Sequence, residues 1–209
     1  MKDIKFYKLV VFVNALVPLA LLGWDWWRGQ VGANPLDFVT RTTGTLTLVF
    51  LVLTLAVTPL RKVTGVQWLI RFRRMLGLYA FFYGSLHLLT YVWFDKWFDL
   101  GAIAQDVTRR QFILVGMFAF TTMLPLAVTS TDKMIKRLGG KRWQKLHRVT
   151  YVSAAAGVFH YYLLVKSDTR KPLLFAAAVA LLLGFRLFVA YTKGPKAKPL
   201  SLTRQAPPR

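Results

Sequence analysis

The sequence predicts an all-α membrane protein, a polytopic bundle of six transmembrane helices with both termini in the cytoplasm. Composition, the lengths of the apolar runs and the distribution of charge lead to this prediction. Of the 209 residues, 55% are hydrophobic and only 18% are charged. A water-soluble domain of this size needs more polar surface, so much of the apolar surface is expected to face lipid. On its own, the formal net charge of +21 would suggest a nucleic-acid-binding protein.

Six apolar runs reach or approach the length that crosses about 30 Å of hydrocarbon as a helix. They cover approximately residues 7–23, 44–60, 74–94, 112–129, 148–165 and 172–192. Their hydrophobicity is continuous rather than alternating every second residue, which excludes membrane-spanning β-strands. The first run continues into Trp24–Trp27 without a small-residue cleavage signal, so an uncleaved helix is favoured over a signal peptide.

Charge predicts the orientation of these spans. Most of the 29 Lys and Arg residues lie at the amino terminus, in the second and fourth connectors and in the tail. The positive-inside rule therefore places both termini in the cytoplasm, and the basic inner face is expected to contact anionic lipids rather than nucleic acid. Residues 1–192 are expected to form one helical domain. The proline-rich, basic residues 193–209 are expected to form a disordered tail.

Three histidines are the candidate functional residues. Because the chain has no Cys and no Glu, thiolate-held metals, iron–sulfur clusters and Glu-bridged di-metal bundles are excluded. His87 and His160 lie on the third and fifth spans, both about 18–20 Å from the cytoplasmic edge at 1.5 Å per residue. Two imidazoles at one depth on different helices can hold a heme through its iron, whereas zinc or copper would need three or four ligands. The alternative is that each histidine only hydrogen-bonds a neighbouring group.

The inner half of the membrane offers a weaker set of candidates. His147 lies at the cytoplasmic mouth of the fifth span, about 20 Å from His160, a separation that would suit a second heme. An ideal helix would turn these two imidazoles roughly 140° apart, and arginine is no iron ligand. Arg73 and Arg74 are candidates for holding a phosphate or a heme propionate, or they only anchor the interface. Arg186 is expected to snorkel to the cytoplasmic edge, with a ligand role as the alternative.

Four stretches of the chain match a known pattern. They are Leu53–Arg61 (LTLAVTPLR), Arg73–Tyr79 (RRMLGLY) followed by His87, Val115–Ser130 (VGMFAFTTMLPLAVTS), and Trp143–Tyr151 (WQKLHRVTY) leading to His160 and Tyr161. Together with the six spans they resemble the ferric-reductase-like transmembrane family. Within it, the pattern is similar to the heme-binding membrane subunits of bacterial periplasmic methionine-sulfoxide reductase systems.

The resemblance implies cofactors and partners. It implies a b-type heme held by His87 and His160, with His147 as a further ligand candidate, and an FMN on the membrane subunit. It also implies a location in the bacterial inner membrane and a heterodimer with a periplasmic molybdopterin-containing catalytic subunit that repairs oxidised envelope proteins. Electrons would come from the quinone pool or a cytosolic flavin reductase. Larger relatives carry a second histidine where this chain has Arg73 and Arg74, which leaves that space for a flavin or quinone.

Other functions make different demands on the sequence. A ferric-reductase or cytochrome b561-like relay to another periplasmic acceptor is the nearest alternative. A transporter with a histidine proton relay would need acidic partners within the spans, and no Asp is placed there. A purely structural anchor would be colourless. The chain lacks a Gly-rich dinucleotide loop, so direct oxidation of a nicotinamide is not expected. No catalytic residue is expected either, because a bis-histidine iron has no open position for substrate.

Overall fold

The computed structural model describes residues 2–192, and every regular element in this range is helical. The long helices are α1 (Lys2–Trp27), α2 (Pro35–Thr64), α3 (Arg73–Leu89), α5 (Gln111–Val128), α8 (Thr150–Leu164) and α9 (Arg170–Thr192). The shorter elements are η1 (Gln67–Phe72), η2 (Thr90–Asp95), α4 (Leu100–Arg109), α6 (Asp132–Leu138), α7 (Gly140–Leu146) and η3 (His147–Val149). The tail expected over residues 193–209 lies outside the described residues.

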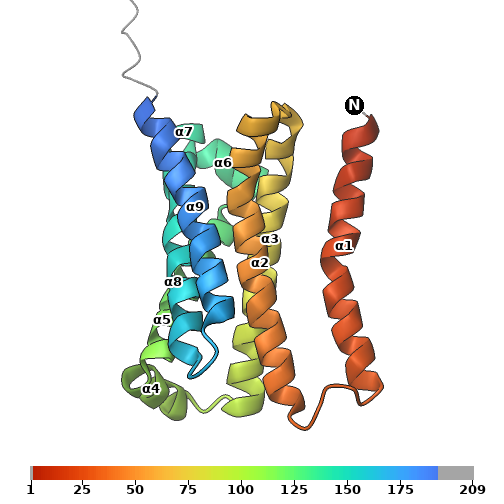
Figure 1. Ribbon diagram of the computed structural model, residues 1–209, viewed down its shortest axis with the longest axis vertical. Coiled ribbons are helices and arrows are strands. Elements are labelled where there is room, and N and C mark those ends of the chain that lie inside the picture. The colour runs from red at the N-terminus through yellow and green to blue at the C-terminus, as the bar shows by residue number, and fades with distance from the viewer. Residues whose placement is uncertain (1, 193–209) are drawn as a thin grey trace, which may run out of the picture.

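The long helices run side by side along one axis (Figure 1). Helices α6 and α7 cover one end of the bundle, where α1 begins and α9 ends, and α4 covers the other end. Following the predicted orientation, we call the end with α6 and α7 the inner end and the end with α4 the outer end. The start of α1 and the end of α9 lie at the same end, as an even number of crossings requires.

Five helical segments are long and apolar enough to cross a membrane. They are Ile4–Trp27, Pro35–Thr64, Gln67–Asp95, Gln111–Val128 and Arg170–Thr192. The remaining predicted span, at 148–165, corresponds to α8, which has only 15 residues. Helical structure nevertheless continues without a break from α7 through η3 into α8. The count of six crossings and the side on which the termini lie therefore stay predictions.

Helix α2 begins well before the predicted start at residue 44. The side chain of Asn34 accepts a hydrogen bond from the backbone N–H of Asp37, and Pro35 follows this cap in the first turn. Both features favour a helix start, because they satisfy or remove backbone N–H groups that have no partner within the helix. The earlier start brings Thr40 and Arg41 into the helix rather than into a connector, and both residues belong to the site described below.

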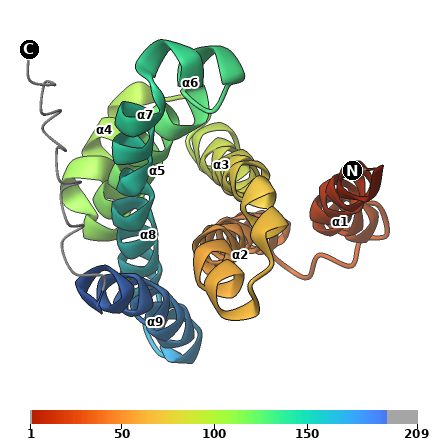
Figure 2. The same cartoon turned by 90° about the horizontal axis from the view of Figure 1, so that it is seen from above.

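Two antiparallel helix pairs form the centre of the bundle: α2 packs on α3, and α5 packs on α8 (Figure 2). In the first pair, the ring of Phe50 stacks on the ring of Tyr83, with centroids 5.3 Å apart and planes 7° apart. In the second pair, the hydroxyls of Thr122 and Ser153 are 2.8 Å apart, and Ser153 is fully buried. The two pairs face each other, and the space between them holds the candidate site.

Arg186 ties α9 to both helix pairs. One terminal amino group donates to the hydroxyl of Tyr151 at 2.7 Å, and the other donates to the backbone carbonyl of Leu55 at 2.7 Å. The side chain therefore turns into the bundle instead of snorkelling to the cytoplasmic edge as the sequence analysis expects. Charge-assisted hydrogen bonds within reach offset part of the cost of burying the guanidinium, and the Tyr151 ring adds a cation–π contact at 5.0 Å.

Helix α1 stands apart from the other long helices and contacts the bundle beside α3 (Figure 2). Two tyrosine hydroxyls on α3 bridge the two helices. Tyr79 donates to the carbonyl of Phe12 at 2.9 Å, and Tyr83 donates to the carbonyl of Ala15 at 2.7 Å. Because Tyr83 is completely buried, its hydroxyl has no solvent to bond with instead. These two bonds fix the position of α1 along α3.

We predict that the double substitution Tyr79→Phe and Tyr83→Phe loosens α1 while leaving the two helix pairs intact. Each lost hydrogen bond is worth about 0.5–1.5 kcal/mol. Hydrogen–deuterium exchange in detergent micelles should show faster exchange within α1 and unchanged exchange in α5 and α8. Tyr162→Phe is the matched control, because this tyrosine is exposed. Unchanged exchange in α1 of the double variant would show that other contacts hold this helix.

Candidate functional site

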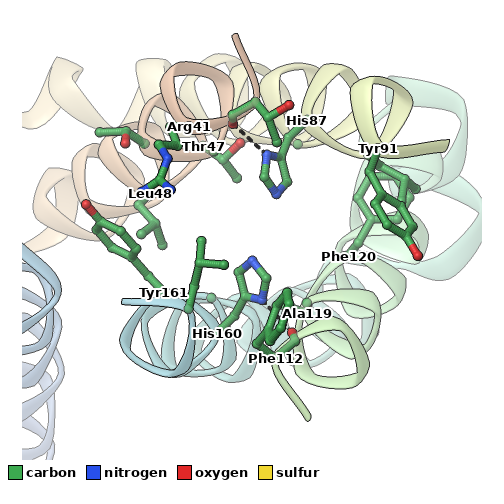
Figure 3. A pocket seen from close by; sticks show the side chains of 18 of the residues that line it. Arg41, Thr47, Leu48, His87, Tyr91, Phe112, Ala119, Phe120, His160 and Tyr161 are labelled. Carbon is green, nitrogen blue, oxygen red and sulfur yellow. Dashed lines mark hydrogen bonds between the residues drawn. The ribbon is translucent and has the colours of Figure 1, made fainter. Parts of the chain in front are cut away.

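His87 and His160 face each other between the two helix pairs (Figure 3). His87 comes from α3 and His160 from α8, and their ring centroids are 6.0 Å apart with the ring planes at 73°. Both rings line a cavity with a volume of about 720 Å³. The structure thus brings together the two histidines that the sequence analysis places at one depth on different helices.

A backbone carbonyl on the neighbouring helix orients each imidazole. Nδ1 of His87 lies 2.8 Å from the carbonyl oxygen of Thr40 on α2, and Nδ1 of His160 lies 2.6 Å from that of Phe112 on α5. A carbonyl oxygen only accepts, so Nδ1 carries the proton and donates in both cases. Nε2 is then the nitrogen with the free lone pair. This is the arrangement by which proteins present a neutral histidine to a metal.

A glycine lies beneath each imidazole, one helical turn after the carbonyl that orients it. A Cβ atom on Gly44 would lie 3.0 Å from both Cε1 and Nδ1 of His87. A Cβ atom on Gly116 would lie 2.8 Å from Nδ1 of His160. Glycine therefore lets each ring approach the helix closely enough to reach the carbonyl. The same arrangement of a carbonyl, a glycine one turn later and an imidazole from the paired helix therefore occurs on α2 and on α5.

The sequence analysis did not identify the glycines or the carbonyl-bearing residues Thr40 and Phe112. Every residue has a backbone carbonyl, so the residue types at positions 40 and 112 do not indicate that Thr40 and Phe112 accept a hydrogen bond from a histidine. Gly116 does offer a signal, because it interrupts an apolar stretch, whereas Gly44 lies in a polar, threonine-rich segment. Recognising that signal requires knowing which helices pair, and this information comes only from the fold.

The geometry fits one iron held between the two imidazoles. Two imidazole nitrogens bound on opposite sides of one metal, at about 2 Å per bond, place the ring centroids about 6 Å apart. The cavity volume lies within the range of ligand pockets, about 300–1,000 Å³. Within residues 2–192, no group of three or more His, Cys, Asp or Glu residues converges on one point. The residues present therefore fit a flat iron macrocycle with two axial histidines better than a metal ion held by protein alone.

His147 lies apart from this pair and does not line the cavity. Its Nδ1 is 3.0 Å from the carbonyl oxygen of Trp143, its Nε2 is 3.4 Å from the hydroxyl of Ser130, and its ring stacks on Trp143 at 3.8 Å. Burial, assisted by the nearby charge of Arg73, lowers the pKa of His147, so the imidazole is neutral at pH 7. The chain leaves α-helical geometry at His147, where η3 begins, so the ideal-helix rotation between His147 and His160 does not apply.

The inner arginines also lie outside the cavity lining. Arg74 forms an ion pair with Asp132, and this hydrogen bond lowers the pKa of the Asp132 carboxyl. Arg73 is half-buried and lies near the positive charges of Arg186 and Arg61. Over the part of the chain that the structure describes, Arg73 forms no ion pair with a carboxylate. Of these inner arginines, Arg73 is therefore the one placed to attract an anion.

A polar network holds the outer end of the site. Asp106 on α4 accepts hydrogen bonds from Lys96 at 2.8 Å and from the hydroxyl of Tyr91 at 3.0 Å, and it pairs with Arg110 at 3.2 Å. The hydrogen bond from Lys96 lowers the pKa of Asp106, and the same bond raises the pKa of Lys96. Both groups are therefore charged at neutral pH. The network connects α4 to η2 and to the start of α5 beside the cavity.

The chain is similar to known membrane proteins. Residues 43–158 match the family described as the ferric reductase like transmembrane component. Three relatives are named protein-methionine-sulfoxide reductase heme-binding subunit MsrQ. The protein of Herminiimonas arsenicoxydans is 50% identical over 94% of this chain and 91% of its own length. That of Ralstonia nicotianae is 49% identical over 90% of this chain and 87% of its own length. That of Azospira oryzae is 51% identical over 86% of this chain and 78% of its own length.

This chain belongs to the MsrQ group of the ferric-reductase-like transmembrane family. The family and the several apolar helices together identify a multi-pass membrane protein. The match to the family includes Gly44, His87 and Gly116, and it ends just before His160. The longer similarity to the MsrQ relatives extends over most of the chain.

We predict that Gly116→Ala displaces the His160 imidazole and that Gly44→Ala displaces His87 to a smaller extent. The order follows from the closer approach at Gly116, and overpacking of this kind costs about 1–3 kcal/mol. In the purified protein, both variants should lose part of the low-spin absorbance that two axial imidazoles give to a heme iron.

Gly184→Ala is the matched control, because a Cβ at this position on α9 meets nothing within 4 Å. Alanine also favours the helix there by about 1 kcal/mol. If Gly44→Ala and Gly116→Ala keep the full low-spin absorbance, the imidazoles do not need the glycines in order to bind.

Proposed function

We propose that this chain is a transmembrane b-type cytochrome of the bacterial inner membrane. It passes electrons from the inner face to a periplasmic molybdopterin-containing subunit that reduces methionine sulfoxide in oxidised envelope proteins. The observation that carries the proposal is the pair His87 and His160, each bonded through Nδ1 to a carbonyl and each lining the same cavity. The name of the relatives, protein-methionine-sulfoxide reductase heme-binding subunit, supports both the heme and the reductase system.

A heme bound here supplies a one-electron redox centre. His87 and His160 would hold this group through its iron, and with both imidazoles bound it would supply electron transfer rather than chemistry on a bound substrate. The carbonyls of Thr40 and Phe112 hold each Nδ1 proton and fix both rings. Apolar side chains such as Leu48, which is 5% exposed, line the cavity and exclude water from the centre.

The inner end is the proposed entry point for electrons. Arg73 is half-buried and unmatched by a carboxylate among the described residues, which supports a role in holding an anionic or electron-rich donor such as FMN or a quinone. Arg74 has Asp132 as its partner, and Arg186 holds Tyr151 and Leu55, so neither is as well placed. A cytosolic flavin reductase is the alternative donor at this face. FMN is included in this proposal because the resemblance to the family implies it.

The periplasmic acceptor distinguishes this proposal from its nearest alternative. The family match alone also suits a ferric-reductase or cytochrome b561-like relay to another periplasmic acceptor. Proteins named for methionine-sulfoxide reductase are 49–51% identical to this chain over 86–94% of its length. This similarity favours the methionine-sulfoxide-reducing subunit as the acceptor.

We predict that His87→Ala and His160→Ala each abolish most of the reducible b-type absorbance of the purified protein. Each substitution removes one of two axial ligands, so the iron loses its low-spin state and its retention in the cavity. His147→Ala is the control, because His147 lies outside the cavity and should leave this absorbance in place. The measurement is a reduced-minus-oxidised spectrum normalised to protein.

The acceptor is tested on the same wild-type preparation. A small, catalytic amount of the periplasmic molybdopterin subunit should reoxidise the whole pool of reduced protein only when methionine sulfoxide is present as the final electron acceptor. Retention of b-type absorbance in both the His87→Ala and the His160→Ala variants would refute the heme assignment. Complete reoxidation by catalytic subunit without methionine sulfoxide, or no reoxidation with it, would refute the acceptor but not the heme.

A further inference from the structure

We propose that Arg41 and Arg110, assisted by Lys171, form a carboxylate-binding site at the outer end of the cavity that holds the heme propionates. This inference rests on the proposed function, because it takes the cavity as the heme site. It assigns a role to three cations that the bis-histidine centre leaves unexplained, and it fixes which edge of the macrocycle faces the periplasm.

The first observation is the uneven distribution of charge in the cavity. Over residues 2–192, the Asp, Lys and Arg side chains that line it are Asp37, Arg41, Asp95, Arg110 and Lys171. All five lie where α2, α5 and α9 begin and where η2 ends, which is the outer end of the bundle.

The opposite end of the cavity is uncharged. Deeper in the cavity, α2, α5 and α8 contribute Leu51, Met123 and Ser153. A b-type heme carries two carboxylates on one edge. Burying a charged carboxylate among apolar groups is strongly unfavourable, so this edge is expected to face the outer end.

The second observation is how the two arginines are held. Nε of Arg41 lies 2.6 Å from Asp37, and Nε of Arg110 lies 3.2 Å from Asp106, in each case a residue four positions earlier. Both ion pairs use Nε, which leaves the two terminal amino groups of each guanidinium to bind a further carboxylate. The aspartates therefore orient the arginines without occupying their terminal amino groups.

The third observation is the position of these arginines relative to the imidazoles. Arg41 directly follows Thr40, whose carbonyl orients His87, and Arg110 precedes Phe112, whose carbonyl orients His160, by two residues. Each half of the site thus supplies an imidazole support and an outer cation from the same region of chain. The N-terminal ends of α2 and α5 add a favourable dipole for anions.

The acidic residues at the same end do not cancel this site. Asp37 is paired with Arg41, and Asp95 is paired with Lys96 at 3.4 Å. Arg73, Arg74 and Arg186, the alternative propionate partners that the sequence suggests, do not line the cavity. We therefore assign the binding of the heme propionates to Arg41 and Arg110 at the outer end and not to the inner arginines.

The test compares heme with its dimethyl ester, which lacks both negative charges. The full-length apo-protein is reconstituted with each compound in detergent, and the rate of transfer to excess apomyoglobin is measured. We expect Arg41→Gln and Arg110→Gln each to accelerate loss of heme about two- to fivefold, the effect of a partly exposed ion pair. We expect the two substitutions to leave loss of the ester unchanged.

Two controls make the result specific. Arg109→Gln removes a neighbouring cation that does not line the cavity, and it should change neither rate. Arg41→Lys combined with Arg110→Lys keeps both charges and should retain heme better than the glutamine variants. The substitutions should preserve folding, because the side chains of Arg41 and Arg110 are 61% and 53% exposed.

The proposal would be overturned if the arginine substitutions accelerated the loss of heme and of its ester equally, or accelerated neither. The bis-histidine assignment would still stand in that case, provided that the wild type shows a low-spin spectrum. An effect of Arg109→Gln as large as that of Arg110→Gln would overturn the proposal too, because it would indicate a general surface effect. A wild-type protein that shows no low-spin spectrum with either compound would instead refute the proposed function on which this inference rests.

Discussion

The hydrogen bond from each histidine Nδ1 to a carbonyl of the neighbouring helix is the interaction on which the site depends. It determines which imidazole nitrogen carries the proton, and it leaves Nε2 of His87 and His160 as the nitrogen available to a metal. It also requires Gly44 and Gly116, because a side chain on either would occupy the space of the ring. The helix pairing, the cavity and the spacing of the two rings are all compatible with this one constraint.

The use of the same device on α2 and α5 explains how a short chain builds a centre between two helix pairs. Each pair supplies one imidazole, one carbonyl and one glycine, so neither pair can complete the site alone. The pairs are connected by Arg186 across α9, α8 and α2 at the inner side and by Asp106 across η2, α4 and the start of α5 at the outer side. A fixed separation of the two rings would suit the proposed role of the centre in electron transfer rather than bond making.

The sequence predicted the elements that depend on hydrophobic periodicity and depth. The six apolar runs correspond to the six long helices, although α8 is shorter than a typical span. The equal depth of His87 and His160 follows from helical rise alone. The early start of α2 was missed because the first turns are polar, and only the Asn34 cap and Pro35 reveal it. The sequence does not predict that Arg186 turns inward, because its hydrogen-bond acceptors lie on other helices. It does not predict the role of Gly44 and Gly116 either, because that role depends on which helices pair.

We propose that His87 and His160 coordinate one iron through neutral imidazoles. Near-infrared magnetic circular dichroism of the oxidised wild-type protein tests it most directly, because the energy of the charge-transfer band identifies the two axial ligands of a low-spin heme. The account predicts the band of bis-imidazole ligation. A band of histidine–methionine, histidine–amine or imidazolate ligation, or the spectrum of a five-coordinate high-spin iron, would contradict it.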